Sequence, residues 1–390
     1  ALPQVLVWAL LGSVCGLVLV LLEGSPPRPH AWNEPNPLVP VRLERHDGRE
    51  EVALEVEGPY EVRVRRSEPR RGRNFRGTIR REGEEVVLPG GELRGHALEF
   101  LPLTDSPIRV EGRAYRGAVR VRAWSRGGIR VLNLLPLEDY LRGVVGAEIG
   151  PASPAAALDA QAIAARTYVL HALPYGPLSD GTGSQVYGGI GREDPRVDAS
   201  VERTRGRVLL WRGKPLPAYY HSTCGGRTSD AREVFGIRAI RPLGGAECGF
   251  CGGSRFYRWE ARLPRESVAR LAAEIGVGAR LLSLRPVDVD PAGRWRAVEF
   301  DGDKARTRRS GREFRSRVNA IAGSERVRST LLEEAKVEGE ELKIVGRGWG
   351  HGVGMCQVGA IALARSGESA DSILARYYPD ATLAPLFLLP

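Results

Sequence analysis

Between Val41 and Leu132 the chain alternates apolar and polar residues in short runs that are separated by glycine and proline. The runs read VALEVE, YEVRVR, EVVLPG, ALEFLPL, IRVEG, AVRVRAW and IRVLNL. A period of two places alternate side chains on opposite faces of a strand, one towards a core and one towards solvent. This region is therefore predicted to form an antiparallel sheet or a small barrel.

A different pattern follows, because residues 154–170 are apolar on nearly every side of a helical projection. Ser153 is expected to cap this helix, with Pro154 at the first helical position, where a missing N–H costs nothing. A helix that is apolar all round is buried in a domain core. It nevertheless carries Asp159, Gln161 and Arg166, and buried polar groups are costly unless they are paired. The helix is thus the first place to look for chemistry.

The rest of the chain mixes helices and strands, so the expected fold class is α+β. A β-rich N-terminal module is assigned to residues 41–110, and a mixed α/β domain with a buried central helix to residues 111–390. Further strands are expected within 204–220, with a turn at Arg212–Gly213, and at 295–300, around 307 and at 342–345. Further helices are expected at 266–275, 311–321, 355–365 and 369–378.

The N-terminal residues 2–22 are almost wholly apolar. About 20 such residues span a bilayer, and neither the shorter core nor the small-residue exit of a cleaved signal peptide is visible. Residues 1–22 are interpreted as a transmembrane anchor, and the proline-rich residues 23–40 as a linker. No Lys or Arg precedes the span and the first basic residue after it is Arg28, so the positive-inside rule gives no support for a C-terminal domain outside the cytoplasm.

The formal net charge of +10 favours an anionic partner such as nucleic acid, a membrane or an acidic cell-wall polymer. The arginines are, however, scattered and often alternate with Val or Glu, as on the solvent faces of strands. No RNA- or DNA-binding motif accompanies them. Nucleic acid is therefore not expected as a partner.

Two pairs of metal-ligating residue types are 23 residues apart: His221-x-x-Cys224 and Cys248-x-x-Cys251. This spacing is typical of a tetrahedral zinc site, and four protein ligands leave no open position for water. One structural zinc ion per chain is the first interpretation. A disulfide between two of the three thiols is the alternative outside the cytoplasm. A redox C-x-x-C is disfavoured, because no thioredoxin-like βαβ pattern surrounds it.

Three blocks of this sequence, in order, resemble the family of the stage II sporulation protein D. The first is LPLEDYLRGVVGAEIGPASPAAALDAQAIAARTYVL. The second is AYYHSTCGGRTSDAREVFG, followed by CGFC and RFYRWE. The third is GRGWGHGVGMCQVGAIALARSG, followed by ILARYYP. Together they extend from about Arg113 to Pro379. Members of the family include peptidoglycan lytic transglycosylases and amidase-enhancer proteins, so residues 111–390 are interpreted as the catalytic domain.

The resemblance implies that Glu148, which the pattern places on a loop, is the catalytic acid and that Arg166 is needed for activity. Many relatives have Pro-x-Glu-Met-Pro around the acid, whereas this chain has Gly-Ala-Glu-Ile-Gly-Pro. Arg166 is expected to contact substrate or to orient the loop, and a structural pair with Asp159 or another buried acid is the alternative. Some members bind zinc near the cysteines and others lack them, so the resemblance permits zinc without requiring it.

Positions that match the family's substrate groove include the glycine-rich block. Trp349 offers a ring on which a sugar could stack, and His351 and Gln357 offer hydrogen bonds, although Gln357 could equally cap a helix. Val358 stands where Trp is common in the family. Tyr257 and Arg258 either line the groove or pack beneath it. A phosphate-binding loop is disfavoured, because no GK[ST] follows the glycines.

A lytic transglycosylase can act with a single carboxyl group, in contrast to hydrolases, which usually need two. The resemblance therefore implies cleavage between N-acetylmuramic acid and N-acetylglucosamine, with Glu148 first as general acid and then as base, and a 1,6-anhydro product. The alternative is a non-catalytic wall-binding protein or an enhancer of a cell-wall amidase. The expected partners are glycan strands, the membrane and an amidase. The expected location is the cell membrane, with the catalytic domain outside the cytoplasm, in sporulation or in another wall process.

Overall fold

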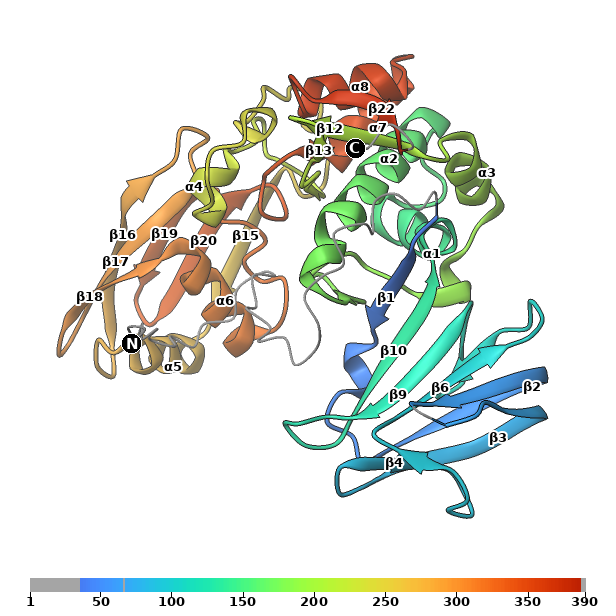
Figure 1. Ribbon diagram of the computed structural model, residues 1–390. Coiled ribbons are helices and arrows are strands. Elements are labelled where there is room, and N and C mark those ends of the chain that lie inside the picture. The colour runs from blue at the N-terminus through green and yellow to red at the C-terminus, as the bar shows by residue number, and fades with distance from the viewer. Residues whose placement is uncertain (1–35, 66, 387–390) are drawn as a thin grey trace, which may run out of the picture. The chain divides into compact units, whose positions relative to one another are not determined.

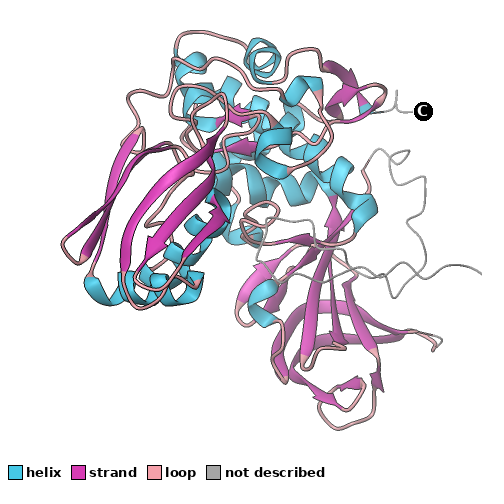
Figure 2. Ribbon diagram, turned by 90° about the vertical axis from the view of Figure 1, so that its left-hand side faces the viewer, coloured by secondary structure: helices cyan, strands magenta, loops and turns pink. Residues whose placement is uncertain are grey.

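The computed structural model describes residues 36–65 and 67–386 (Figure 1). The expected anchor and residues 23–35 of the expected linker lie outside this part. Within the described residues, no helix is long and apolar enough to cross a bilayer. The last residues of the expected linker are not a linker, because Leu38–Arg42 form strand β1. The fold is α+β, as predicted, and the strands of the N-terminal sheet gather with few helices among them (Figure 2).

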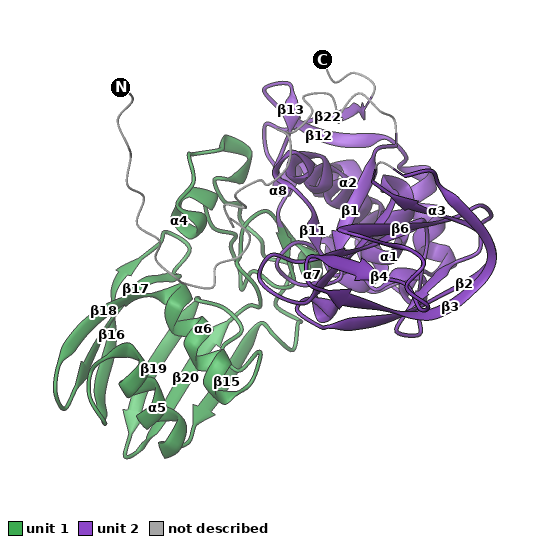
Figure 3. Cartoon of the chain, turned by 60° about the horizontal axis from the view of Figure 1, so that its bottom comes forward, with its two compact units in different colours: residues 1–18, 220–359 green, residues 19–219, 360–390 purple. Residues whose placement is uncertain are grey.

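The chain forms two compact units, which are coloured separately in Figure 3. Among the described residues, unit 2 contains 36–219 and 360–386, apart from residue 66, and unit 1 contains 220–359. The boundary at 359/360 falls inside one helix, α7. The helices of the described part are α1 (Leu137–Ile149), α2 (Ala155–Ala172), α3 (Pro195–Arg203), α4 (Ala231–Phe235), α5 (Arg265–Ile275), α6 (Gly311–Ala322), α7 (Gln357–Arg365) and α8 (Ala370–Tyr377).

Unit 2 begins with a large sheet in the order β11-β1-β10-β9-β6-β2-β3-β4-β5, to which β7 and β8 are attached through β2. The expected module boundary at residues 110/111 does not separate its strands, because β9 pairs with β6 and β10 pairs with both β9 and β1. The strands after β1 are β2 (Glu51–Val64), β3 (Arg70–Glu82), β4 (Glu85–Val87), β5 (Arg94–Gly95), β6 (Ala97–Pro102), β7 (Ile108–Val110), β8 (Arg113–Tyr115), β9 (Ala118–Ala123), β10 (Ile129–Pro136) and β11 (Leu178–Ser179).

The segment before the buried helix is itself helical, so the expected loop around Glu148 is wrong. In α1 the residues Leu137, Tyr140, Leu141 and Val144 follow the i, i+3, i+4, i+7 spacing of a buried helical stripe, and all four are fully buried. Helix α1 ends at Gly150, whose φ of 85° suits glycine. Glu148 therefore lies in the last turn of α1.

The buried helix expected over residues 154–170 is confirmed as α2, although its start differs in detail. Pro154 is the N-cap rather than the first helical residue, and no side chain caps the helix. The Ser153 hydroxyl donates instead to the carbonyl of Ile149, at 2.8 Å. Ser153 thus satisfies a free carbonyl at the end of α1.

Unit 2 closes with a small sheet that joins distant parts of the chain. Strand β12 (Arg207–Trp211) pairs with β13 (Lys214–Pro215) and with β22 (Thr382–Pro385). The turn expected at Arg212–Gly213 is confirmed, with φ values of 52° and 73°, as a two-residue hairpin requires.

Unit 1 packs α5 and α6 with two three-stranded sheets, β15-β20-β19 and β16-β17-β18. The helices expected at 266–275 and 311–321 are confirmed as α5 and α6. The short parallel pair β14 and β21 lies in the same unit and brings residue 221 beside residue 356. The strands are β14 (Tyr220–His221), β15 (Arg258–Leu263), β16 (Leu281–Val289), β17 (Trp295–Gly302), β18 (Arg306–Ser310), β19 (Leu332–Glu338), β20 (Glu341–Arg347) and β21 (Met355–Cys356).

Candidate functional site

The carboxyl group of Glu148 is half-buried at the end of α1 in unit 2. Its Oε1 atom accepts a hydrogen bond from the backbone N–H of Val186, at 2.6 Å. Tyr140 lies two turns earlier on the same helix, and its hydroxyl is buried. Burial and the neighbouring Glu148 carboxylate raise the pKa of Tyr140 well above its usual value, so this phenol stays protonated. Glu148 is therefore an acid held by the backbone beside a neutral hydroxyl.

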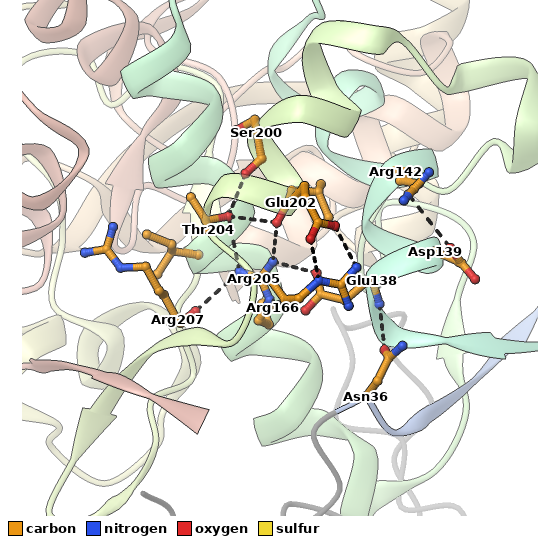
Figure 4. Close-up of polar contacts among 12 residues, drawn as sticks. Asn36, Glu138, Asp139, Arg142, Arg166, Ser200, Glu202, Thr204, Arg205 and Arg207 are labelled. Atoms are coloured by element: carbon orange, nitrogen blue, oxygen red, sulfur yellow. Dashed lines mark hydrogen bonds and ion pairs between the residues drawn. The ribbon is translucent and has the colours of Figure 1, made fainter. Parts of the chain in front are cut away.

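Arg166 is fully buried and is paired with an acid of α1 (Figure 4). Its Nε and one terminal nitrogen donate to the two oxygens of Glu138, at 2.9 and 2.7 Å. The terminal nitrogens also donate to the carbonyls of Val201 and Arg207, each at 3.3 Å. A two-pronged pair of this kind holds both charges in place. The structure thus gives Arg166 the structural role that was the alternative to substrate contact, with Glu138 as the acid.

Asp159 does not take part in that pair. Its carboxylate accepts hydrogen bonds from the guanidinium of Arg203, at 2.6 and 3.0 Å, and from the Ser200 hydroxyl, at 2.5 Å. Arg203 is half-exposed. The two acids on α1 and α2 therefore serve one buried and one surface arginine, and both pairs tie these helices to the segment around α3.

Four cysteines meet inside unit 1: Cys224, Cys248, Cys251 and Cys356. All four are buried and unoxidised, and their sulfur atoms lie within 4.8 Å of one another. The expected ligand set is therefore wrong in one member, because Cys356 occupies the place assigned to His221. The parallel pairing of β14 with β21 sets His221 opposite Cys356, which is why Cys356, 132 positions after Cys224, completes the cluster.

The surroundings of the cluster suit sulfur atoms that carry negative charge. Backbone N–H groups of Cys224 and Gly359 point at the Cys356 sulfur, at 3.3 and 3.4 Å, and that of Gly226 points at the Cys224 sulfur, at 3.4 Å. A hydrogen bond from Cys224 lowers the pKa of Cys251 to about 7, whereas burial raises that of Cys356 well above normal. Four close thiols cannot all ionise without a cation, and a tetrahedral Cys₄ set is what zinc prefers. The donor set thus fits a structural metal ion.

His221 lies beside the cluster as a neutral packing residue. Its Nδ1 atom is 3.1 Å from the carbonyl of Val353, and its ring is 5.5 Å from that of His351. Burial and the nearby Arg294 lower the pKa of His221 to about 3. Burial likewise lowers the pKa of His351 well below its normal value. Both rings are therefore uncharged at neutral pH.

The glycine-rich block packs against its own chain. Gly348 has a φ of 72°, and a Cβ atom there would lie 2.5 Å from the Thr223 carbonyl. Gly352 has a φ of 83°, and a Cβ atom there would lie 2.2 Å from the guanidinium of Arg294. These glycines let residues 348–352 approach the segment that carries Cys224, so their first role is to build the cysteine cluster.

The remaining candidate residues differ in exposure. Trp349 is half-buried and exchanges backbone hydrogen bonds with Thr223, while its ring lies 4.4 Å from that of Phe256. Arg258 is exposed and pairs with Glu333 at 2.8 Å. Tyr257 is half-buried, and Gln357 is 6% exposed at the start of α7. Unit 1 therefore gathers Trp349, His351 and the cysteines, and Glu148 belongs to unit 2.

Comparison with known proteins shows the family of the chain. A family model described as stage II sporulation protein matches residues 125–211, which include α1, α2 and Glu148. An uncharacterized protein of Brachyspira hyodysenteriae is 31% identical over 283 residues, which cover 70% of this chain and 73% of that protein. The chain belongs to the stage II sporulation protein D family.

Two further members have informative names. Stage II sporulation protein D of Bacillus subtilis is 27% identical over 277 residues, covering 64% of this chain and 75% of the relative. A protein named amidase enhancer, also of Bacillus subtilis, is 28% identical over 340 residues, covering 74% of this chain and 47% of the relative. Family membership associates the chain with the cell wall.

Sequence reasoning missed three residues that build these sites in this family member. Cys356 could have been found by counting, because it is a fourth cysteine in the same part of the chain and Cys₄ is a common zinc set. Glu138 had a weaker signal, as an acid inside an apolar run. Arg294 had none, yet it is fully buried and donates to the carbonyl of Cys224, at 3.1 Å. It places a positive charge beside the cluster.

Proposed function

We propose that this protein is a peptidoglycan lytic transglycosylase in which Glu148 is the general acid and then the base. The protonated carboxyl group donates its proton to the oxygen that links C1 of N-acetylmuramic acid to N-acetylglucosamine. The resulting carboxylate takes the proton of the C6 hydroxyl of the same muramic residue. That oxygen bonds to C1, and a 1,6-anhydro ring forms without addition of water.

The observation that carries this proposal is the setting of Glu148 in the residues matched by the family model. The carboxyl group is half-buried, is held by the N–H of Val186 and lies at the C-terminal end of α1. The partial negative charge of a helix C-terminus disfavours an additional negative charge nearby. Partial burial and the helix C-terminus suit an acid that must hold a proton until the glycosidic oxygen needs it. The Val186 N–H favours the ionised form, and its part is to fix the position of the carboxyl group.

The test is a comparison of Glu148→Gln with Asp139→Asn on purified glycan strands. Gln keeps an oxygen for the Val186 N–H but has no proton to transfer, so release of anhydro-muramyl products should fall by about 10²-fold or more. Asp139 is half-exposed on the same helix, and its replacement should leave the rate unchanged. Anhydro-muramyl products formed at the wild-type rate by Glu148→Gln would refute the proposal.

A second candidate function is activation of a cell-wall amidase, favoured by the relative named amidase enhancer. In that case the protein binds wall glycan and cuts nothing. Purified protein would then release no anhydro-muramyl ends, yet it would accelerate an added amidase, and Glu148→Gln would accelerate it equally. The two assays run on the same sample therefore separate the candidates.

We also propose that the four cysteines hold one structural zinc ion. Cys224, Cys248, Cys251 and Cys356 supply four ligands, so the ion would have no open position for a substrate. It would stabilise the packing of the glycine-rich block against residues 221–226. Residues 2–22 are proposed as a membrane anchor, with the catalytic domain on the side of the membrane that faces the wall.

A further inference from the structure

One face of the N-terminal sheet of unit 2 carries a continuous row of charged side chains. Residues that pair directly across strands share a face, so the register traces the row. Arg42 of β1 is opposite Leu132 of β10, and Leu132 is opposite Arg120 of β9. Arg120 is opposite Glu99 of β6, and Glu99 is opposite Arg63 of β2.

The row continues on β3 and widens at β9 and β10. Glu61, two residues before Arg63 and therefore on the same face, is opposite Arg71. Arg122 and Arg130 form the neighbouring cross-strand pair. We call this set the arginine row, and it consists of Arg42, Arg63, Arg71, Arg73, Arg120, Arg122 and Arg130 together with Glu61 and Glu99. The row crosses six neighbouring strands, which is about 24 Å at the usual strand spacing.

The acids of the row do not neutralise it. Glu61 is bonded by Arg63 and Arg71, at 2.7 and 3.3 Å, so it shares one charge between two arginines. Glu99 accepts from Arg120, at 2.5 Å. Within the described residues, Arg73 is exposed and forms no ion pair. At the other end, Asp47 pairs with Arg42 and lies 3.7 Å from Arg130, and Glu44 lies 3.7 Å from Arg42. Seven guanidinium groups thus face four carboxylates, so the row retains an excess of positive charge.

At one end of the row, the ring of Trp124 contacts two of these guanidinium groups. The guanidinium carbon of Arg130 is 4.4 Å from the centre of the Trp124 ring, and that of Arg42 is 5.9 Å from it. Cation–π contacts of this kind restrain a long side chain. A ligand that pairs with restrained arginines loses less side-chain entropy on binding.

We propose that the arginine row is a docking surface for a glycan strand of peptidoglycan, bound through the lactyl carboxylates of its muramic acid residues. The inference rests on the proposed function, because it assumes that the wall glycan is the ligand. The lactyl carboxyl group is free only on muramic residues that carry no stem peptide, so the proposed ligand is a strand from which the peptides have been removed. On such a strand a charged sugar alternates with an uncharged one, so its carboxylates are separated. Separated guanidinium groups with carboxylates between them match that spacing and offer hydrogen-bond acceptors to hydroxyl and acetamido groups.

The chemistry of the row favours this polymer over a lipid surface. Leu132, which lies between Arg42 and Arg120 in the strand register, is only 6% exposed, so it offers nothing to insert among acyl chains. The alternating acids would also repel the continuous negative charge of an anionic bilayer. The row would thus hold a long strand on unit 2, which also carries Glu148.

The experiment measures co-sedimentation with purified wall sacculi whose stem peptides have been removed by an amidase, in the Glu148→Gln background, so that the strands stay intact. The triple variant Arg71→Gln, Arg73→Gln, Arg120→Gln keeps Glu61 and Glu99 within reach of Arg63. The control is Arg265→Gln, Arg270→Gln, Arg306→Gln, which removes the same charge from exposed sites of unit 1. We expect the first set to lose at least about tenfold in affinity, or about 1.4 kcal/mol, and the control to lose less than twofold.

Three ligand preparations test the chemistry. Binding should persist on amidase-treated sacculi stripped of phosphate polymers and on soluble strands freed of stem peptides, and should vanish when the lactyl carboxyl groups are converted to neutral amides. Loss of binding in either of the first two preparations would overturn the proposal, as would equal losses in both triple variants. Arginine-dependent binding to vesicles of anionic phospholipid that matches binding to strands would overturn it in favour of a membrane.

Failure of the docking surface can be distinguished from failure of the proposed catalytic function. Turnover of short soluble glycan fragments, which cannot reach along the row, reports only on Glu148 and should be unchanged in the triple variant. If Glu148 has no catalytic role, the sedimentation assay still measures binding of the strand to the arginine row. If the arginine row does not bind the strand, cleavage of the short fragments still measures catalysis by Glu148. Circular dichroism of both triple variants checks that the sheet is intact.

Discussion

The two units bury polar groups in opposite ways. In unit 2 the Arg166 guanidinium and the Glu138 carboxylate are fully buried, and each satisfies the other through two hydrogen bonds. In unit 1 four buried thiols face one another, and the single positive charge of the neighbouring Arg294 could not balance four thiolates. The first cluster is complete within the chain, whereas the second requires a cation to become a set of ligands.

Because of this difference, we expect the two units to have different requirements for folding. A paired buried charge costs desolvation but holds its partners in a fixed geometry. A thiolate cluster without a metal ion combines that cost with repulsion, so metal binding and folding are coupled. Unit 2 is therefore expected to be stable on its own residues, and unit 1 to depend on an ion.

The largest effect should follow metal removal or loss of a ligand. Cys356→Ser should reduce the bound zinc well below one equivalent per chain, and a strong chelator should do the same to the wild type. Structural zinc contributes on the order of 10 kcal/mol in small zinc domains, so the unfolding transition of unit 1 should collapse while that of unit 2 persists. Elemental analysis and differential scanning calorimetry measure the two quantities.

The matched control for this prediction is His221→Asn, which alters the residue that sequence spacing favours as a ligand. His221 packs against Val353 and His351, so its replacement should cost some stability but leave the zinc content at one equivalent. If His221→Asn lost the metal and Cys356→Ser kept it, the ligand set described here would be wrong. A disulfide mapped between any two of the four cysteines would also contradict it.

The second effect concerns the complete cluster. Arg166→Met removes one partner and leaves the Glu138 carboxylate buried alone, which should cost about 3–5 kcal/mol. The double variant Arg166→Met, Glu138→Leu should recover most of that loss, because no buried charge is then left unpaired. Arg203→Met is the control, since its pair with Asp159 is half-exposed, and it should cost about 1 kcal/mol or less.

Chemical denaturation of the unit 2 transition measures these free energies. A double variant as unstable as Arg166→Met would mean that packing, rather than pairing, is what Arg166 provides. Retained glycan cleavage in a folded double variant would show further that the arginine is structural. Loss of activity with full stability would restore its assignment as a substrate contact.

The contrast also explains what the sequence could predict. Helices α5 and α6 were predicted closely, because a buried face imposes a repeat that can be counted. Helix α2 was predicted from the opposite signal, an apolar run of helical length with no polar face. The helix around Glu148 was missed, since two glycines and the following Gly-Pro favoured a loop, and tertiary burial of Leu137, Tyr140 and Val144 outweighed that local signal. In this segment, tertiary packing therefore outweighed the local conformational preference of the residues.

Long-range pairing is what a single sequence could not supply. The two C-x-x-C-type pairs suggested a metal site, but only the pairing of β14 with β21 decides that Cys356 joins it. In the same way, Arg166 could be recognised as a buried charge, but its partner could not be chosen between Asp159 and another acid. Acids of both helices were available, and the geometry of α1 against α2 selects Glu138.

The smallest of the three effects tests whether the stability of unit 2 depends on its own buried side chains alone. His46 is 1% exposed in that unit, and burial together with Arg49 and Arg45 lowers its pKa to about 4. Because the unfolded chain binds a proton near pH 6.5 and the folded chain does not, stability is full above pH 6.5 and falls as the pH drops towards 4. The loss should be on the order of 2 kcal/mol.

His46→Leu should flatten this pH dependence in the unit 2 transition, measured by denaturation at pH 7 and pH 4.5. His96→Leu, which changes the imidazole bonded to the Glu84 carbonyl, is the control and should leave the slope as it is. An unchanged slope in His46→Leu would mean that carboxylates, and not this buried ring, set the acid sensitivity of unit 2.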